Sequence, residues 1–310
     1  MIAQGFFAGE RGRFALVLIA TGMGWGLTQP LGKLAVSTGH GHFGLIFWQL
    51  AICTLLLGLL ATAQGKRLPV TRQGLQFGLV VAILGTIVPN TTFYLSIARL
   101  PSGVMSILIS MVPLLAFPMA LALGMDRFSR RRAMGLTLGL LAVALIALPG
   151  ESLPDPAMAA FIPLALIGPL FYAMEGNYVA MKGTAGLDAV QAMLLASVIG
   201  MGIALPLAVG SGQFISPFRS YGPAEGALVA SACVHALAYV GYVWLAARAG
   251  AVFAAQCSYI VTASGVVWAM ILLGERFSPF LWAAMAVMLV GLSLVQPRKA
   301  ALTGARAPDM

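Results

Sequence analysis

Glu175 is the residue whose type and position most clearly suggest chemistry in this sequence. It lies inside the apolar stretch 158–181 and is the only acid well inside any such stretch. An ionisable group in hydrocarbon costs about 2.5 kcal/mol or more, so an acid there usually has a function. Glu175 could bind a proton and a cationic group in turn. A structural hydrogen bond to a neighbouring helix is the alternative.

His235 is the second titratable candidate, at the centre of the apolar stretch 224–247. Tyr239 and Tyr242 follow it at i+4 and i+7, which gives a helix one polar and aromatic face. Imidazole titrates near neutral pH and therefore suits proton coupling. A packing role for His235, through a hydrogen bond, is equally open.

Further polar and aromatic residues recur at spacings of 3 or 4 within other apolar stretches. Small polar side chains also hold membrane helices together, so each residue taken singly is as readily structural. With Glu175 and His235 as the proton-coupling candidates, the expected binding residues are Glu175, Tyr172, Trp25, Thr28, Gln29, Asn90, Phe93, Ser110, His235, Tyr239, Tyr259 and Gln256.

The sequence offers little for covalent, nucleotide or metal chemistry. It contains no Gly-x-x-x-x-Gly-Lys-Ser/Thr, His-Glu-x-x-His or Gly-x-Ser-x-Gly motif. His40 and His42 provide two possible metal ligands, which make a poor site without a third. The three cysteines, at 53, 233 and 257, lie in apolar stretches and are interpreted as buried side chains. We therefore expect no metal and no cofactor.

The elements that must position these residues are transmembrane helices. Of 310 residues, 60% are hydrophobic and 9% are charged, far from the composition of a soluble domain. A spanning helix needs about 20 apolar residues. The sequence predicts an all-α integral membrane protein with ten spans, at 14–34, 43–63, 74–97, 102–125, 133–149, 158–181, 187–209, 224–247, 250–274 and 279–296.

The basic residues predict how these spans are oriented. Fourteen of the 18 Lys and Arg residues lie on the side of the N-terminus and four on the other. The positive-inside rule then places both termini in the cytoplasm, with the chain in the inner membrane. The net charge of +9 is explained by this orientation, so no nucleic-acid partner is expected. The first span is too long for a signal peptide and is interpreted as uncleaved.

An internal repeat divides the chain into two halves. Leu-Gly-Met-Asp-Arg-Phe-Ser at 123–129 closes the fourth span, and Leu-Gly-Glu-Arg-Phe-Ser at 273–278 closes the ninth. The five spans between them are an odd number, so the copies face opposite sides of the membrane. The prediction is two inverted five-helix repeats, 1–149 and 150–310, with a site between them near mid-membrane. The repeat also sets Thr28 opposite Glu175.

The sequence resembles the EamA-like branch of the drug/metabolite transporter superfamily over nearly its whole length. The resemblance rests on Trp25-Gly26 with Lys33, residues 94–103 (YLSIARLPSG), Pro113, residues 244–250 (WLAARAG), Ser258-Tyr259 and Gly274-Glu275. Members of this branch often carry Arg in span two, Glu at the end of span four and Pro in span nine. Here these positions are Gln49, Asp126 and Thr262.

The resemblance implies a ten-helix permease, and the residues add what its cargo could be. Glu175 without a mid-depth Arg or Lys favours a small amine-bearing or zwitterionic metabolite. We expect a secondary transporter with alternating access, and by family analogy a proton-coupled exporter. An importer of the same fold, an intramembrane enzyme or a sensor are the alternatives. The expected partners are the solute, membrane lipid, protons and, as an open question, a second copy of the chain.

Overall fold

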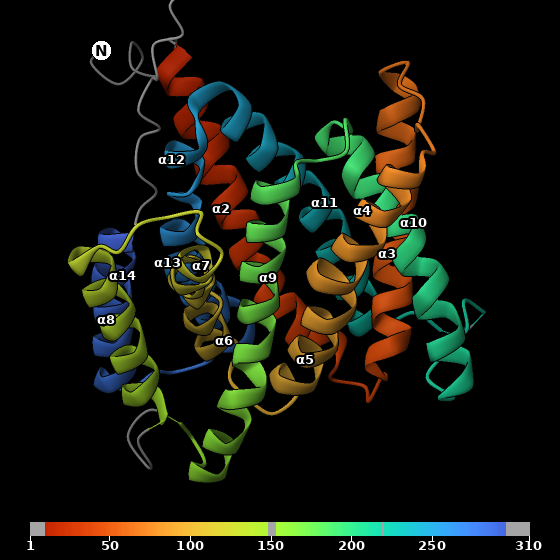
Figure 1. The fold of residues 1–310 in the computed structure, drawn as a ribbon. Coiled ribbons are helices and arrows are strands. Elements are labelled where there is room, and N and C mark those ends of the chain that lie inside the picture. Colours follow the sequence, from red (N-terminus) through yellow and green to blue (C-terminus); the bar gives the residue numbers. More distant parts are fainter. Residues whose placement is uncertain (1–9, 148–152, 219, 296–310) are drawn as a thin grey trace, which may run out of the picture.

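The computed structural model describes residues 10–147, 153–218 and 220–295, and its helices follow the ten predicted spans (Figure 1). The boundary at 149/150 and the C-terminal residues 296–310 lie outside the described residues. The first half contains α2 (Glu10–Ala35), α3 (His42–Ala63), α4 (Arg72–Ala82), η1 (Ile83–Ile87), α5 (Val88–Ile97), α6 (Ser102–Leu108), α7 (Met111–Ala122) and α8 (Arg130–Ala147). The second half contains η2 (Pro156–Phe161), α9 (Ile162–Lys182), α10 (Ala189–Gly210), α11 (Pro223–Ala249), α12 (Ala251–Ala254), α13 (Cys257–Leu273) and α14 (Pro279–Val295).

These helices have the length and surface of membrane spans. Within the described residues, seven spans are long and apolar enough to cross a bilayer, and α13 and α14 are shorter apolar helices. α8 carries Arg130, Arg131 and Arg132 in its first turn, ahead of an apolar stretch. Large apolar side chains on the outside, such as Leu55 and Leu237 at 62% and 69% exposure, would face lipid rather than water.

Three spans are interrupted along their length. Span three changes from α4 through the π-helix η1 to α5, and the Val88 amide donates to Ile83 O across five residues. Pro89 follows and has no amide hydrogen to continue the ladder. Span four is divided between α6 and α7 at Ser110, and span nine between α12 and α13 at Gln256. Irregular backbone inside a membrane is tolerated where protein or a cavity surrounds it.

The two halves pack on each other in a paired pattern. Helix α2 of the first half packs against α11 and α13 of the second half. Helix α9 of the second half packs against α5 and α7 of the first half. α3 packs against α10, and α8 lies beside α14 at one edge of the bundle (Figure 1). If each span of one half is replaced by the equivalent span of the other half, five spans away, the same set of packed pairs results. This packing supports the prediction of two related five-helix repeats.

The bundle has two end faces that differ in charge. We call the face where α2, α4, α8, α10 and α12 begin the arginine-rich face, since Arg67, Arg72, Arg127, Arg130 and Arg131 belong to the span ends there. The opposite face holds Lys33, Arg99 and Arg276 among the described residues. Which compartment each face meets remains a prediction from the charge distribution.

Candidate functional site

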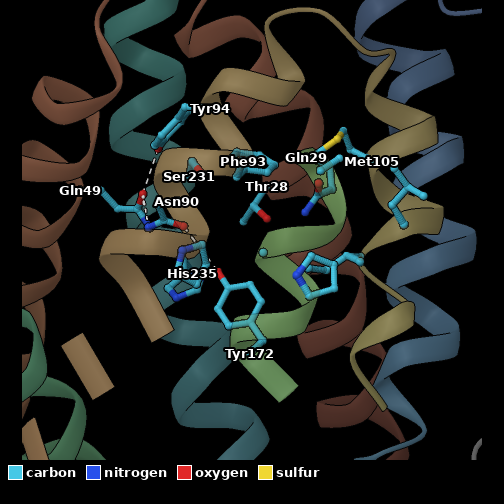
Figure 2. A pocket seen from close by; sticks show the side chains of 16 residues that line it. Thr28, Gln29, Gln49, Asn90, Phe93, Tyr94, Met105, Tyr172, Ser231 and His235 are labelled. Atoms are coloured by element: carbon cyan, nitrogen blue, oxygen red, sulfur yellow. Dashed lines mark hydrogen bonds between the residues drawn. The ribbon is translucent and has the colours of Figure 1, made fainter. Parts of the chain in front are cut away.

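A cavity lies between helices of both halves, near the middle of the spans (Figure 2). Its volume is about 60 Å³, and since one water needs about 10–15 Å³, it holds only a few waters in this conformation. A metabolite would therefore require the helices to move apart. The lining comprises Thr28, Gln29, Gln49, Pro89, Asn90, Phe93, Tyr94, Met105, Leu108, Ile109, Ala165, Gly168, Pro169, Tyr172, Ser231 and His235.

Helical periodicity explains why these residues share one space. On α9 the lining residues Ala165, Gly168, Pro169 and Tyr172 recur at steps of 3 or 4 and so occupy one face. Proline inside a membrane helix leaves a carbonyl without its helical donor, which a lined cavity can accommodate. The cavity therefore lies where α9 and the broken spans three and four meet.

One wall of the cavity is a hydrogen-bonded chain of amides and phenols. The Tyr94 hydroxyl donates to Gln49 Oε1 at 2.9 Å, and Asn90 Nδ2 donates to the same oxygen at 3.4 Å. The Tyr172 hydroxyl donates to Asn90 Oδ1 at 3.4 Å (Figure 2). The chain joins α3, α5 and α9. No hydrogen bond among the described residues occupies Gln49 Nε2, so this donor is available to a bound solute.

The other wall is formed by α2 and α11. Thr28 donates its hydroxyl to Trp25 O at 2.7 Å, and Ser231 and His235 lie four residues apart on α11. The Trp25 ring lies behind this wall, 6.4 Å from the His235 ring and 5.3 Å from Tyr242 between centroids. No charged side chain lines either wall in the part of the chain that the structure describes.

Glu175 lies one turn of α9 beyond Tyr172, outside the cavity lining and toward the arginine-rich face. Its carboxyl group lies against Gly85 of η1, where an added methyl group would be 2.6 Å from Cδ and both oxygens. Tyr239, one turn of α11 beyond His235, lies within electrostatic reach of this carboxyl group. We call Gly85, Glu175 and Tyr239 the acid layer.

The carboxylate of Glu175 has no hydrogen bond or ion pair within residues 10–147, 153–218 and 220–295. Tyr172 and Tyr239 approach it closely enough for electrostatic interaction. A half-buried carboxylate without a protein partner can have its charge compensated by a proton or a cation. The exchange role of Glu175 remains a prediction beside the structural alternative.

The structure divides the twelve residues expected from the sequence into two sets. Six line the cavity: Thr28, Gln29, Asn90, Phe93, Tyr172 and His235. Six lie outside the lining: Trp25, Ser110, Glu175, Tyr239, Gln256 and Tyr259. Thr28 and Glu175, expected opposite each other, belong to different layers, and their roles in binding remain predictions.

The residues outside the lining have identifiable places. Ser110 hydrogen-bonds Thr262 where span four breaks, joining α7 to α13. Gln256 connects α12 to α13, and Tyr259 packs against the main apolar core. These side chains were grouped with the site because they share helical spacing with polar neighbours. Such spacing identifies a common face but not the partner that the face meets.

Ten of the 16 lining residues were not expected as contacts from the sequence, among them Gln49, Tyr94, Met105 and Ser231. Gln49 is an amide within the otherwise apolar α3, a signal that could have identified it. Ser231 precedes His235 by four residues and so shares its face. Tyr94 and Met105 carry no such signal, because aromatic and apolar side chains are common in every span.

Comparison with known proteins shows what this ten-helix fold is similar to. The sequence pattern of the EamA-like transporter family matches residues 13–148. The chain is a multi-pass membrane protein, and over these residues it is similar to this family of transporters. This similarity favours a transporter over the intramembrane enzyme.

A solved structure shows the same fold over almost the whole chain. It is titled "Crystal structure of protein", has a TM-score of 0.63 and is 14% identical in sequence. The match covers 91% of this chain and 97% of the other. No curated protein matches the sequence.

Proposed function

We propose that this transporter moves a small amine-bearing or zwitterionic metabolite by alternating access through the cavity. The observation that supports this cargo is the lining itself, which offers amide and hydroxyl groups from both halves without a fixed charge. A phosphate ester or another anion would lose its hydration there without meeting a cation. A zwitterion or an amine can be matched by hydrogen bonds and aromatic faces.

Aromatic rings supply the second part of this selectivity. Phe93 and Tyr172 line the cavity, and Trp25 lies behind His235. A ring face attracts an ammonium group by about 0.5–2 kcal/mol. The carbonyl oxygens of the Asn90 and Gln49 side chains accept further hydrogen bonds. Together these groups favour a positively charged nitrogen over a negatively charged oxygen.

We further propose that Glu175 couples this movement to protons. A protonated carboxyl is neutral and tolerates burial, while an arriving ammonium group favours the charged form and expels the proton. If both cannot occupy the acid layer together, cargo and proton exchange in opposite directions. With a proton gradient directed into the cell, this exchange drives export, the direction suggested by family analogy. His235 is the alternative proton carrier.

Purified protein in proteoliposomes tests the proposed cargo. A thermal-shift screen of amines, amino acids, sugars and phosphate esters identifies a ligand, since a bound solute stabilises the folded state by mass action. The vesicles should then show saturable flux of the chemically unchanged solute, and amines should outcompete anions. If a phosphate ester ranks above every amine, the cargo proposal is wrong. Binding without flux would indicate a sensor.

A further inference from the structure

The connection between α5 and α6, on the opposite face, is held by two charged side chains. Lys33 at the end of α2 donates through Nζ to Ile97 O at 2.7 Å and to Leu100 O at 2.9 Å. Glu275 accepts the backbone amides of Ser102 and Gly103, at 2.8 and 3.0 Å, one on each carboxylate oxygen. Hydrogen bonds to charged groups are roughly twice as strong as neutral ones. The two side chains thus fix this connection to the ends of α2 and α13.

An aromatic contact adds to these hydrogen bonds. The Phe277 ring fills the space beside Gly103, where a side chain would approach its Cε1 to 2.9 Å. Only glycine permits the ring to lie so close to the backbone of the connection. We call Lys33, Glu275 and Phe277, together with residues 97–103, the outer clamp.

The repeat places the same residue types on the arginine-rich face. At a constant separation of 149 positions, Lys33 corresponds to Lys182, and Glu275 and Phe277 correspond to Asp126 and Phe128. The connection 97–103 corresponds to 246–252, where Ala-Arg recurs as Ala247-Arg248. In an inverted repeat these residues occupy the equivalent position at the other end of the bundle.

These equivalent residues are not engaged with their connection in this structure. Asp126 forms an ion pair with Arg132, and its other oxygen accepts the Arg127 amide at 2.7 Å. Lys182 is exposed and has no hydrogen bond to residues 246–252 within the described backbone. The Phe128 ring is 68% exposed, whereas Phe277 packs against the core. The clamp is therefore formed at one end and absent at the other.

We propose that Asp126, Lys182 and Phe128 form a reciprocal inner clamp on residues 246–252 when the transporter opens to the opposite face. Asp126 would then exchange Arg132 for the backbone amides of the connection between α11 and α12. The inference rests on the alternating access proposed above and names the contacts that alternate. A single carboxylate that has a partner in both states keeps the two conformations close in free energy, as a reversible transporter requires.

The exchange of partners by Asp126 can be tested without any solute, by measuring how accessible the cavity is from each face. In protein with Cys53, Cys233 and Cys257 replaced by alanine, Ser231→Cys places a single thiol in the cavity lining. A membrane-impermeant maleimide is applied to one face at a time. The readout is the labelling rate from the opposite face divided by the rate from the arginine-rich face. Because no cargo is involved, this result is independent of the flux experiment.

The variants are chosen so that partner exchange and a simple ion pair predict different results. Arg132→Gln frees Asp126 for the inner clamp. It should raise the labelling ratio about tenfold, which corresponds to the free energy of one hydrogen bond to a charged group. Glu275→Gln opens the outer clamp and should also raise the ratio. Asp126→Asn removes the inner clamp and should leave the labelling ratio at or below that of the protein with Ser231→Cys alone. If it raises the ratio as Arg132→Gln does, Asp126 serves only its ion pair and the proposal is wrong.

Two further variants guard against misfolding and general charge effects. Lys182→Gln changes an exposed side chain, and combined with Arg132→Gln it should reverse most of the increase. No reversal would overturn the role of Lys182 in the clamp. Asp188→Asn breaks the ion pair with Lys66 at 2.8 Å on the same face and should leave the ratio unchanged. A change as large as that of Arg132→Gln would mean that charge alone controls the ratio.

Discussion

At the scale of single residues, Glu175 carries the proposed coupling. Glu175→Gln keeps nearly the same shape but can no longer exchange a proton, so we expect cargo to cease accumulating against a gradient while folding is retained. Uptake into proteoliposomes with an imposed pH difference measures this. Glu10→Gln, at the exposed start of α2, serves as the control. A Glu175→Gln protein that still concentrates cargo with unaltered pH dependence would transfer the role to His235.

Gly85 offers a separate test of the acid layer. Gly85→Ala places a methyl group 2.6 Å from the Glu175 carboxyl atoms, so that side chain must move. We expect loss of proton-driven uptake, while downhill cargo exchange continues because the cavity lining is unchanged. Gly58→Ala is the matched control, because nothing lies within 4 Å of the new methyl group. Equal behaviour of the two variants in both assays would mean that the position of Glu175 is unimportant.

At the scale of elements, the hydrogen-bonded chain that joins α3, α5 and α9 should determine binding. Asn90→Leu removes the link between Gln49 and Tyr172 and should weaken cargo affinity about tenfold. The dissociation constant follows from the ligand dependence of the thermal shift. Asn177→Leu is the contrast, since Asn177 donates to Ala116 O between α9 and α7. It should lower the melting temperature and leave affinity unchanged, and the reverse pattern would contradict the assignment.

The elements themselves could be predicted from the sequence, but their breaks could not. Membrane helices can be recognised from the length and apolar composition of a segment. The ends of the ten predicted spans therefore agree with the observed helix ends to within a few residues. The π-helix at Ile83–Ile87 depends on what surrounds it, because Gly85 must face the Glu175 carboxyl there. The cavity depends on these breaks. The sequence therefore predicts which residues lie on the same face of a helix, but not whether that face contacts the cavity, the acid layer or another helix.

At the scale of the whole molecule, the two faces differ in charge and in whether their clamp contacts are formed. The outer clamp lies on the face with fewer basic residues, and the acid layer lies between the cavity and the arginine-rich face. If the arginine-rich face is cytoplasmic, the clamp that is formed in this structure lies at the outer end of the bundle. The orientation of the chain therefore decides which step of transport the structure represents.

Reporter fusions determine this orientation directly. The excess of basic residues on the side of the N-terminus predicts that fusions after Arg132 and Arg306 report a cytoplasmic location. A fusion near Ser152 should report the periplasm, because an odd number of spans separates it from the N-terminus. As a control, moving the first fusion to a point after Ser37 should reverse its signal. A periplasmic signal after Arg306 would contradict the ten-span topology, and the inverted repeat and the two alternating clamps would be lost with it.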